Sequence, residues 1–173
     1  MRLKNKEKIK TARLTLRSFN DGDAEDMIAM LTDSEIKKTY MIPALDAREK
    51  QMKLFTRFKG LSLTDEHFVY AICNENKLVG FMNDVEIDED FVELGYVISP
   101  EYKGRGYATE ALSAAIEEIF ASGFLCVKTG AFEENKASIR VMEKCSMTRT
   151  DQMDFIEYRG KKHRCVYFEK RKG

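Results

Sequence analysis

Apolar and polar positions change their spacing several times along the chain, and each spacing predicts a helix or a strand. Apolar residues three and four apart predict helices, whereas alternating or continuous runs rich in aromatic and β-branched residues predict strands. We expect strands over residues 13–17, 67–73, 77–87, 91–98, 124–130, 153–158 and 163–169. We expect helices that begin near residues 24, 46, 108 and 136.

The order of these elements predicts the fold class. It runs strand, two helices, a three-strand meander, helix, strand, helix and a closing two-strand hairpin. We therefore expect a single α+β domain over residues 1–173, with one mixed sheet of about seven strands flanked by about four helices. Strand 124–130 should run parallel to strand 91–98, because a helix connects the two. The basic segment 1–10 is expected to be frayed.

Polar residues mark the expected helix starts. Either Asp21 or Asp23 should cap the first helix, and Asp46 followed by Glu49 has the spacing of a capping box for the second. Asn135 should cap the last helix in the same way.

A glycine loop joins the central strand to the third helix. Pro100 ends strand 91–98, since proline cannot donate to a sheet ladder. Gly104 and Gly106 allow a tight turn and a close approach of the backbone to a ligand. The helix then begins near Ala108, and its unpaired N–H groups favour a phosphate or a pyrophosphate.

Two well-known nucleotide motifs do not match this loop. A P-loop requires Gly-x-x-x-x-Gly-Lys-Ser/Thr, and the sequence has no such run. A dinucleotide-binding loop requires glycine or alanine where this chain has Thr109, and an acidic residue at the end of the following strand, which is missing. An NAD-dependent dehydrogenase therefore remains only an alternative, which failure to bind NAD would exclude.

Composition and charge favour an ordinary globular protein. The 173 residues are 43% hydrophobic and 34% charged, and 29 basic residues balance 29 acidic ones. This balance predicts no nucleic-acid partner. No apolar run reaches the ~20 residues that span a bilayer, and the first ten residues lack the apolar segment of a signal peptide. We therefore expect no membrane partner and a cytoplasmic location.

The cysteines and histidines predict no metal site. The four cysteines are far apart in sequence and fall inside expected strands or a helix, so buried free thiols are expected at Cys73, Cys126, Cys145 and Cys165. The two histidines are also distant from each other, and neither lies in a metal-binding motif.

The loop Lys103-Gly-Arg-Gly-Tyr-Ala108 resembles the Arg/Gln-x-x-Gly-x-Gly/Ala loop of the GCN5-related N-acetyltransferases. The string from Glu93 to Ala111 resembles the branch that contains the ribosomal-protein N-terminal acetyltransferases of Rim type, as does Arg13–Arg17 before an Asp- and Ala-rich helix. The resemblance extends from Arg13 to Phe168 and implies the GNAT fold, with acetyl-coenzyme A as the cosubstrate of an acyltransferase.

This resemblance also implies the residues that hold the cofactor. The glycine loop would cradle the pyrophosphate, a backbone N–H of the preceding strand would bind the oxyanion, and the start of the last helix would lie near the pantetheine arm. The implied cofactor-binding residues are Val97, Ile98, Lys103, Gly104, Arg105, Gly106, Tyr107, Ala108, Thr109, Asn135 and Ser138. Tyr96 and Tyr107 are expected to pack or to lie on the adenosine side.

Three positions depart from the family pattern. Lys103 stands where arginine or glutamine is usual, and Val141-Met142 replaces the tyrosine that reprotonates the leaving thiolate in many members. Ser138 is then the group expected to hydrogen-bond the sulfur, as in the Rim-type branch. Ser146 follows the last helix where glycine is usual, so it should adopt a left-handed conformation or the chain should leave the helix differently.

The expected chemistry is direct acetyl transfer to a primary amine. An α-amine ionises near 7.7–8.0 and costs about 1 kcal/mol to neutralise at pH 7, against about 4.6 kcal/mol for a lysine amine. A protein or peptide N-terminus therefore needs only a modest base, and Glu93 is the candidate, acting through water. Residues 33–45 should either line the acceptor side, as the resemblance implies, or belong to the core.

The sequence leaves two alternative functions open. The acceptor can be a small-molecule amine, or the chain can be a non-catalytic acyl-coenzyme A-binding module of the same fold. Strands near the C-terminus allow either a monomer or a homodimer.

Overall fold

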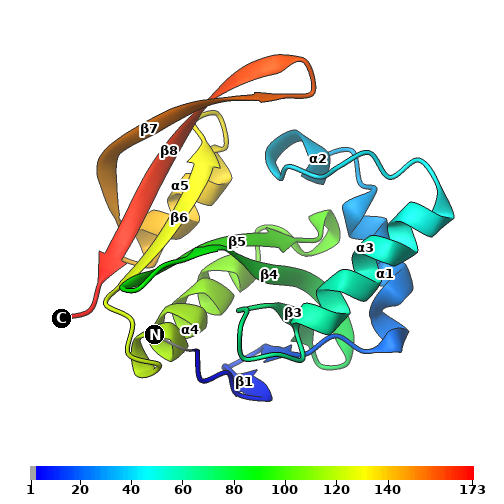
Figure 1. Cartoon of the computed structure of the whole chain (residues 1–173), viewed down its shortest axis with the longest axis horizontal. Coiled ribbons are helices and arrows are strands. Elements are labelled where there is room, and N and C mark those ends of the chain that lie inside the picture. Colours follow the sequence, from blue (N-terminus) through cyan, green and yellow to red (C-terminus); the bar gives the residue numbers. More distant parts are fainter. Residues whose placement is uncertain (1–2) are drawn as a thin grey trace.

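The computed structural model describes residues 3–173 as one twisted eight-stranded sheet with helices on both faces (Figure 1). The strand order is β1-β2-β3-β4-β5-β6-β8-β7, and only β5 and β6 run parallel. The strands are β1 (Lys8–Lys10), β2 (Thr15–Arg17), β3 (Tyr70–Asn74), β4 (Lys77–Ile87), β5 (Phe91–Ile98), β6 (Cys126–Phe132), β7 (Thr148–Tyr158) and β8 (Lys161–Arg171). The α-helices are α1 (Ala24–Leu31), α2 (Ile36–Thr39), α3 (Arg48–Leu61), α4 (Tyr107–Ala121) and α5 (Lys136–Lys144).

This architecture confirms the α+β class, the mixed sheet and the parallel crossover through α4. The sheet has one strand more than the seven expected, and the additional strand is β1. The structure also has one helix that was not expected, α2, which lies within segment 33–45. Four residues are too few to give a helical period, so the sequence did not reveal α2.

The N-terminal segment is not frayed in the part that the structure describes. β1 pairs antiparallel with β2, and the side chains of Leu3 and Ile9 are buried in the core. The prediction of fraying is therefore wrong for this part, because two apolar side chains anchor an otherwise basic strand. Residues 1 and 2, which belong to the same prediction, lie outside the described residues.

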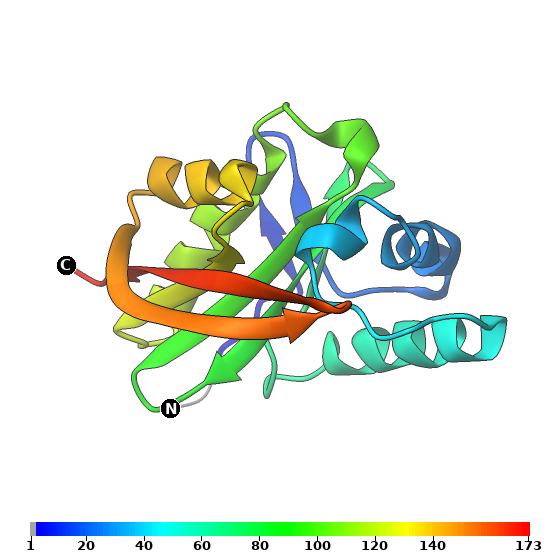
Figure 2. The same ribbon diagram turned by 90° about the horizontal axis from the view of Figure 1, so that it is seen from above.

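Two apolar cores lie on opposite faces of the sheet (Figure 2). α4 and α5 cover one face, where Leu94 of β5 packs with Leu112 and Ile116 of α4. α1 and α3 cover the other face, where Val97 of β5 packs with Phe55 of α3. β5 contributes to both cores because successive side chains of a strand point to opposite faces.

The caps of the two N-terminal helices differ from the sequence prediction. A 3₁₀ turn precedes α1, and Asn20 caps it in a capping box with Asp23. Asp23 directly precedes α1 but its side chain makes no cap hydrogen bond to that helix. Its carboxylate instead accepts from the Asn20 amide at 2.9 Å and pairs with Arg17 at 2.7 Å. α3 begins without a side-chain cap, so the expected capping box of Asp46 and Glu49 is wrong.

α3 begins one residue later than this capping box requires, so that Ala47, which has no capping side chain, occupies the N-cap position. The Asp46 carboxylate accepts from Lys50 Nζ at 2.7 Å, one helical turn away, instead of from the helix N-terminus. In α3, Phe55 is buried and Leu54 and Phe58 are partly buried, whereas Ala47, just before the helix, is exposed.

The last helix and the cysteines agree with the sequence prediction. Asn135 caps α5 by accepting a hydrogen bond from the Ser138 amide at 3.2 Å. Of the two alternatives expected for Ser146, the structure shows the left-handed backbone, with φ of 58°. All four cysteines are free and buried.

The sheet opens between β5 and β6. Their pairing covers Phe91–Leu94 and ends at Leu94 with Thr129, while the pairing of β5 with β4 continues to Ile98. Figure 1 shows the two strands diverging from this point. β6 continues instead along β8 as far as Phe132. The second half of β5 therefore has a strand neighbour on one edge only.

Candidate active site

A cleft with a volume of about 360 Å³ occupies the opening between β5 and β6. The N-terminus of α4, the first turns of α5 and the short helix α2 border it. All predicted site residues except Glu93 and Arg105 line this cleft, namely Val97, Ile98, Lys103, Gly104, Gly106, Tyr107, Ala108, Thr109, Asn135 and Ser138. The structure thus brings together two segments that are about thirty residues apart in sequence.

The glycine loop presents the N-terminus of α4 to the cleft. Gly104 and Gly106 have φ of 77° and 80°, the left-handed conformation that glycine tolerates best. The first hydrogen bond of the helix runs from the Glu110 amide to the Gly106 carbonyl at 3.1 Å. The amides before Glu110 therefore lack helical acceptors and are available to an anion, as is typical of helix N-termini.

Arg13 holds this loop in place. Its guanidinium donates to the Arg105 carbonyl at 2.7 Å and to the Glu110 carboxylate at 2.8 Å, and it lies 4.8 Å from the centre of the Tyr107 ring. Sequence reasoning placed Arg13 in a strand and in the family resemblance but missed its contacts to the loop, because these partners are more than ninety residues away. Arg105, which was expected to add charge, instead lies over the Tyr102 ring at 5.2 Å and does not line the cleft.

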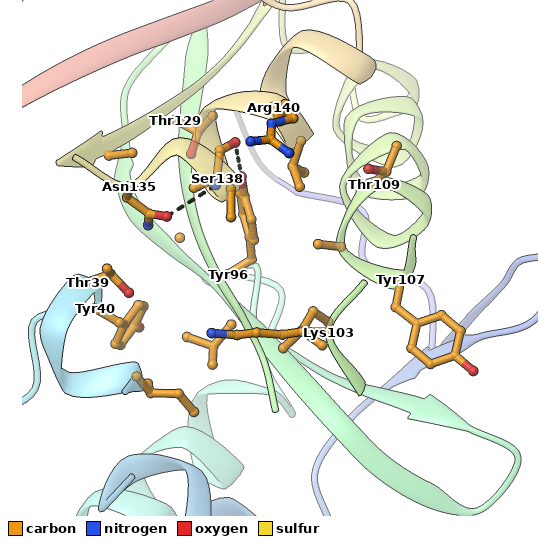
Figure 3. Close-up of a pocket in the computed structure, with 18 of the residues that line it drawn as sticks. Thr39, Tyr40, Tyr96, Lys103, Tyr107, Thr109, Thr129, Asn135, Ser138 and Arg140 are labelled. Carbon is orange, nitrogen blue, oxygen red and sulfur yellow. Dashed lines mark hydrogen bonds between the residues drawn. The ribbon is translucent and has the colours of Figure 1, made fainter. Parts of the chain in front are cut away.

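Three other cations border the cleft. Lys103 lies on the glycine loop, and Arg140 and Lys144 face it from α5 (Figure 3 labels the first two). Arg140 and Lys144 are four residues apart and so share one helix face. Sequence reasoning missed both, although this spacing was the available signal. Cations around a concave site attract polyanionic ligands.

Ser138 and Tyr96 form a hydrogen-bonded pair at the centre of the cleft (Figure 3). Their hydroxyl oxygens are 2.9 Å apart, and the Asn135 cap fixes the backbone of Ser138. Burial raises the pKa of Tyr96 well above its usual value, so the phenol stays protonated at neutral pH. Tyr96, which the sequence assigned to packing, is therefore a polar partner of Ser138.

Glu93 lies just outside the cleft. It is on the same sheet face as Gly95, which lines the cleft two residues further along β5. At the usual strand rise this places the two residues roughly 6.6 Å apart. Burial, followed by the neighbouring Glu86 carboxylate, raises the pKa of Glu93, while Lys128 opposes that shift.

Tyr40 and its neighbours in α2 form the remaining wall. Ile36, Thr39 and Tyr40 line the cleft, and the Tyr40 hydroxyl donates to Asn83 Oδ1 at 2.5 Å. The Tyr158 hydroxyl of β7 donates to the Tyr40 carbonyl and accepts from the Ile42 amide, both at 3.3 Å. Segment 33–45 thus lines the cleft with Tyr40 and at the same time buries Ile36 and Ile42 in the core.

Comparison with known proteins shows the family to which this protein belongs. The family model of the acetyltransferase (GNAT) domain matches residues 13–148. The chain belongs to the GNAT family of acetyltransferases. This membership, and the N-acetyltransferase names of its relatives, favour an enzyme over a non-catalytic module and over a dehydrogenase.

Relatives of this GNAT enzyme match most of its length. The uncharacterised N-acetyltransferase YnaD of Bacillus subtilis (strain 168) is 32% identical over 143 residues, which is 82% of each chain. A GNAT-family acetyltransferase structure from Bacillus anthracis is 25% identical with a TM-score of 0.81, covering 95% of this chain and 98% of that one. The RimL ribosomal L7/L12 alpha-N-protein acetyltransferase, solved with coenzyme A, shares the fold with a TM-score of 0.85 at 18% identity, covering 95% and 98%.

The described part of this GNAT enzyme, residues 3–173, contains no cluster of three or more histidine, cysteine or acidic side chains that could hold a metal ion. Over the same residues, the helices are too short or too polar to cross a bilayer.

Proposed function

We propose that this GNAT enzyme transfers the acetyl group of acetyl-coenzyme A to a primary amine, and that the acceptor is the α-amine of a protein or peptide. The observation that carries the proposal is the cleft between the diverging strands β5 and β6, with the free amides of α4 at one end and the Ser138–Tyr96 pair at its centre. Two proteins of the same fold were solved with coenzyme A or acetyl-coenzyme A, RimL and the microcin C7 self-immunity acetyltransferase MccE.

The residues of the cleft fit this cofactor. The glycine loop leaves backbone amides open to the pyrophosphate, and its shape depends on Gly106, whose added Cβ would lie 3.3 Å from Arg13 Nη2. Lys103 on one side, with Arg140 and Lys144 on the other, balance the phosphate charge. The pantetheine arm would then run along the open edge of β5 towards Ser138.

The sheet register favours Ile98 over Val97 as the oxyanion donor. Antiparallel partners alternate between bonded and unbonded pairs, and the Ser99 amide donates to the Val79 carbonyl of β4 at 2.8 Å. The register runs without a shift from this pair to Gly80–Ile98 and Phe81–Val97. Val97 should therefore face β4, while the amide of Ile98 points to the edge that β6 has left. A fixed N–H donor at this position contributes about 3 kcal/mol to catalysis.

The acetyl transfer then proceeds in three steps, namely attack, collapse of the tetrahedral intermediate and proton removal. The neutral amine attacks the thioester carbon, the carbonyl oxygen becomes an oxyanion held by the Ile98 amide, and the carbon–sulfur bond breaks. Glu93 takes the amine proton through a water molecule, which its distance from the cleft requires. Ser138, held by the Tyr96 hydroxyl, donates a hydrogen bond to the departing thiolate, which ionises near 8.5 and needs little further help.

The acceptor side supports an α-amine for an energetic reason. Glu93 is a modest base even with its raised pKa, and an α-amine costs several kcal/mol less to neutralise than a lysine amine. A small-molecule amine is the second candidate, because MccE, whose complex includes AMP, has the same fold with a TM-score of 0.81.

The test combines ligand binding with turnover. Thermal melts with acetyl-coenzyme A, coenzyme A and NAD should show stabilisation by the two coenzyme A forms only. Thiol release should then be measured with peptides that carry a free N-terminus, with the same peptides blocked at the N-terminus but containing lysine, and with small amines. Turnover only with free N-termini is expected. Failure of both coenzyme A forms to stabilise the protein would refute the cofactor, and turnover only with lysine or small amines would refute the acceptor.

A further inference from the structure

One buried hydroxyl in the cleft has no partner. Thr129 on β6 is 1% exposed, and its Oγ1 forms no hydrogen bond with any atom of residues 3–173. A buried hydroxyl without a partner costs about 1–3 kcal/mol, and most such groups in proteins are paired. Thr129 also lines the cleft, and Figure 3 shows its side chain beside Ser138 and Asn135.

Thr129 lies where the sheet opens into the cleft. It lies opposite Leu94 in the last pair that joins β5 to β6, so the cleft begins immediately beyond it. Its side chain shares a sheet face with Val127 and Ala131, which pack in the core under α4 and α5. A valine has nearly the same shape and would fill this site without an unpaired hydroxyl. The polar atom is thus unexplained by packing.

We propose that the Thr129 hydroxyl binds the pantetheine arm of the acyl donor, at the amide nearest the sulfur. This assignment rests on the proposed function, which places the sulfur at Ser138 and the pyrophosphate at the glycine loop. Thr129 lies at the Ser138 end of the cleft and away from Lys103 (Figure 3). An amide can both donate to and accept from a hydroxyl, so either orientation pairs Oγ1. The ligand then satisfies the hydroxyl that the free enzyme leaves unpaired.

The experiment compares Thr129→Val with Thr129→Ser and wild type, measuring the Kd of coenzyme A and of acetyl-coenzyme A by calorimetry. The valine variant should bind both ligands about fivefold more weakly, the equivalent of one neutral hydrogen bond, while serine restores most of the affinity. Its melting temperature without ligand should not fall, because no internal hydrogen bond is lost. Thr129→Ala provides a second variant without the hydroxyl.

Thr150→Val on β7 is the matched control. Its hydroxyl donates to the Tyr167 carbonyl at 3.2 Å and lies outside the cleft, so this variant should melt lower but keep its affinity. Unchanged affinity in both Thr129→Val and Thr129→Ala would overturn the proposal. A loss restricted to acetyl-coenzyme A would also overturn it, since both ligands carry the same pantetheine amide. Failure of wild type to bind either ligand would instead refute the proposed function.

Discussion

Replacing Gly106 by alanine tests the glycine loop, because a second glycine offers the same backbone strain without the site. Gly106 has φ of 80°, and an added Cβ would lie 3.3 Å from Arg13 Nη2, so the side chain that holds the loop must move. Gly160, in the turn between β7 and β8, has φ of 74° and no atom within 4 Å of an added Cβ. Gly160→Ala is therefore a control for strain alone.

The two variants should lose similar stability without ligand. A left-handed residue other than glycine costs about 1–2 kcal/mol, which corresponds to roughly 2–8 °C in Tm for a chain of this size. At a concentration about 100 times Kd, acetyl-coenzyme A adds roughly 2.7 kcal/mol to wild type and to Gly160→Ala. We expect the displaced loop of Gly106→Ala to lose one charge-assisted hydrogen bond to the pyrophosphate, which raises the Kd of acetyl-coenzyme A about tenfold. The same concentration then adds only about 1.4 kcal/mol.

The assay is a thermal melt of wild type and both variants with and without acetyl-coenzyme A, followed by calorimetry for Kd. The ligand-induced rise in Tm should be about half as large for Gly106→Ala as for Gly160→Ala. Equal rises would refute the assignment of the loop to the cofactor, since both variants carry the same strain. A much larger loss of stability in Gly106→Ala alone would show that Arg13 cannot adjust.

Three further predictions concern the base, the cap and the sheet. Glu93→Gln should slow turnover and flatten the acidic limb of the pH–rate profile, and an unaltered profile would reject the base. Because burial raises the pKa of Glu93, ionising this group destabilises the folded state, so the variant should melt higher than wild type at pH values above that raised pKa and equally at pH values below the ordinary pKa of a glutamate. Asn135→Ala should destabilise the protein by about 1 kcal/mol, measured by chemical denaturation, and should lower turnover in steady-state kinetics because Ser138 is no longer held. Full activity of this variant would show that the cap does not contribute to catalysis. Gly80→Ala should be the most destabilising glycine change, by more than about 2 kcal/mol, because its Cβ would lie 2.3 Å from the Val97 carbonyl; a melt close to wild type would contradict this packing.

Local patterns predicted most of the elements and the ends of several. Strand 91–98, the parallel crossover, the Asn135 cap and the left-handed Ser146 each depend on residues close together in sequence. Local signals failed where a distant or competing partner decided the outcome. Asp46 binds Lys50 instead of the helix start, and Leu3 and Ile9 hold a segment whose lysines indicated fraying.

The family resemblance, the glycine loop and the residues at the start of α5 could be recognised from the amino-acid sequence, because each is a contiguous motif whose chemistry follows from its spacing. How these motifs meet depends on the folded chain. The divergence of β5 from β6, the Arg13 contacts to the loop, the pairing of Tyr96 with Ser138 and the unpaired Thr129 hydroxyl all join residues far apart in the chain. Such contacts depend on sheet register and on which helix face packs inward, and neither quantity is contained in a local pattern.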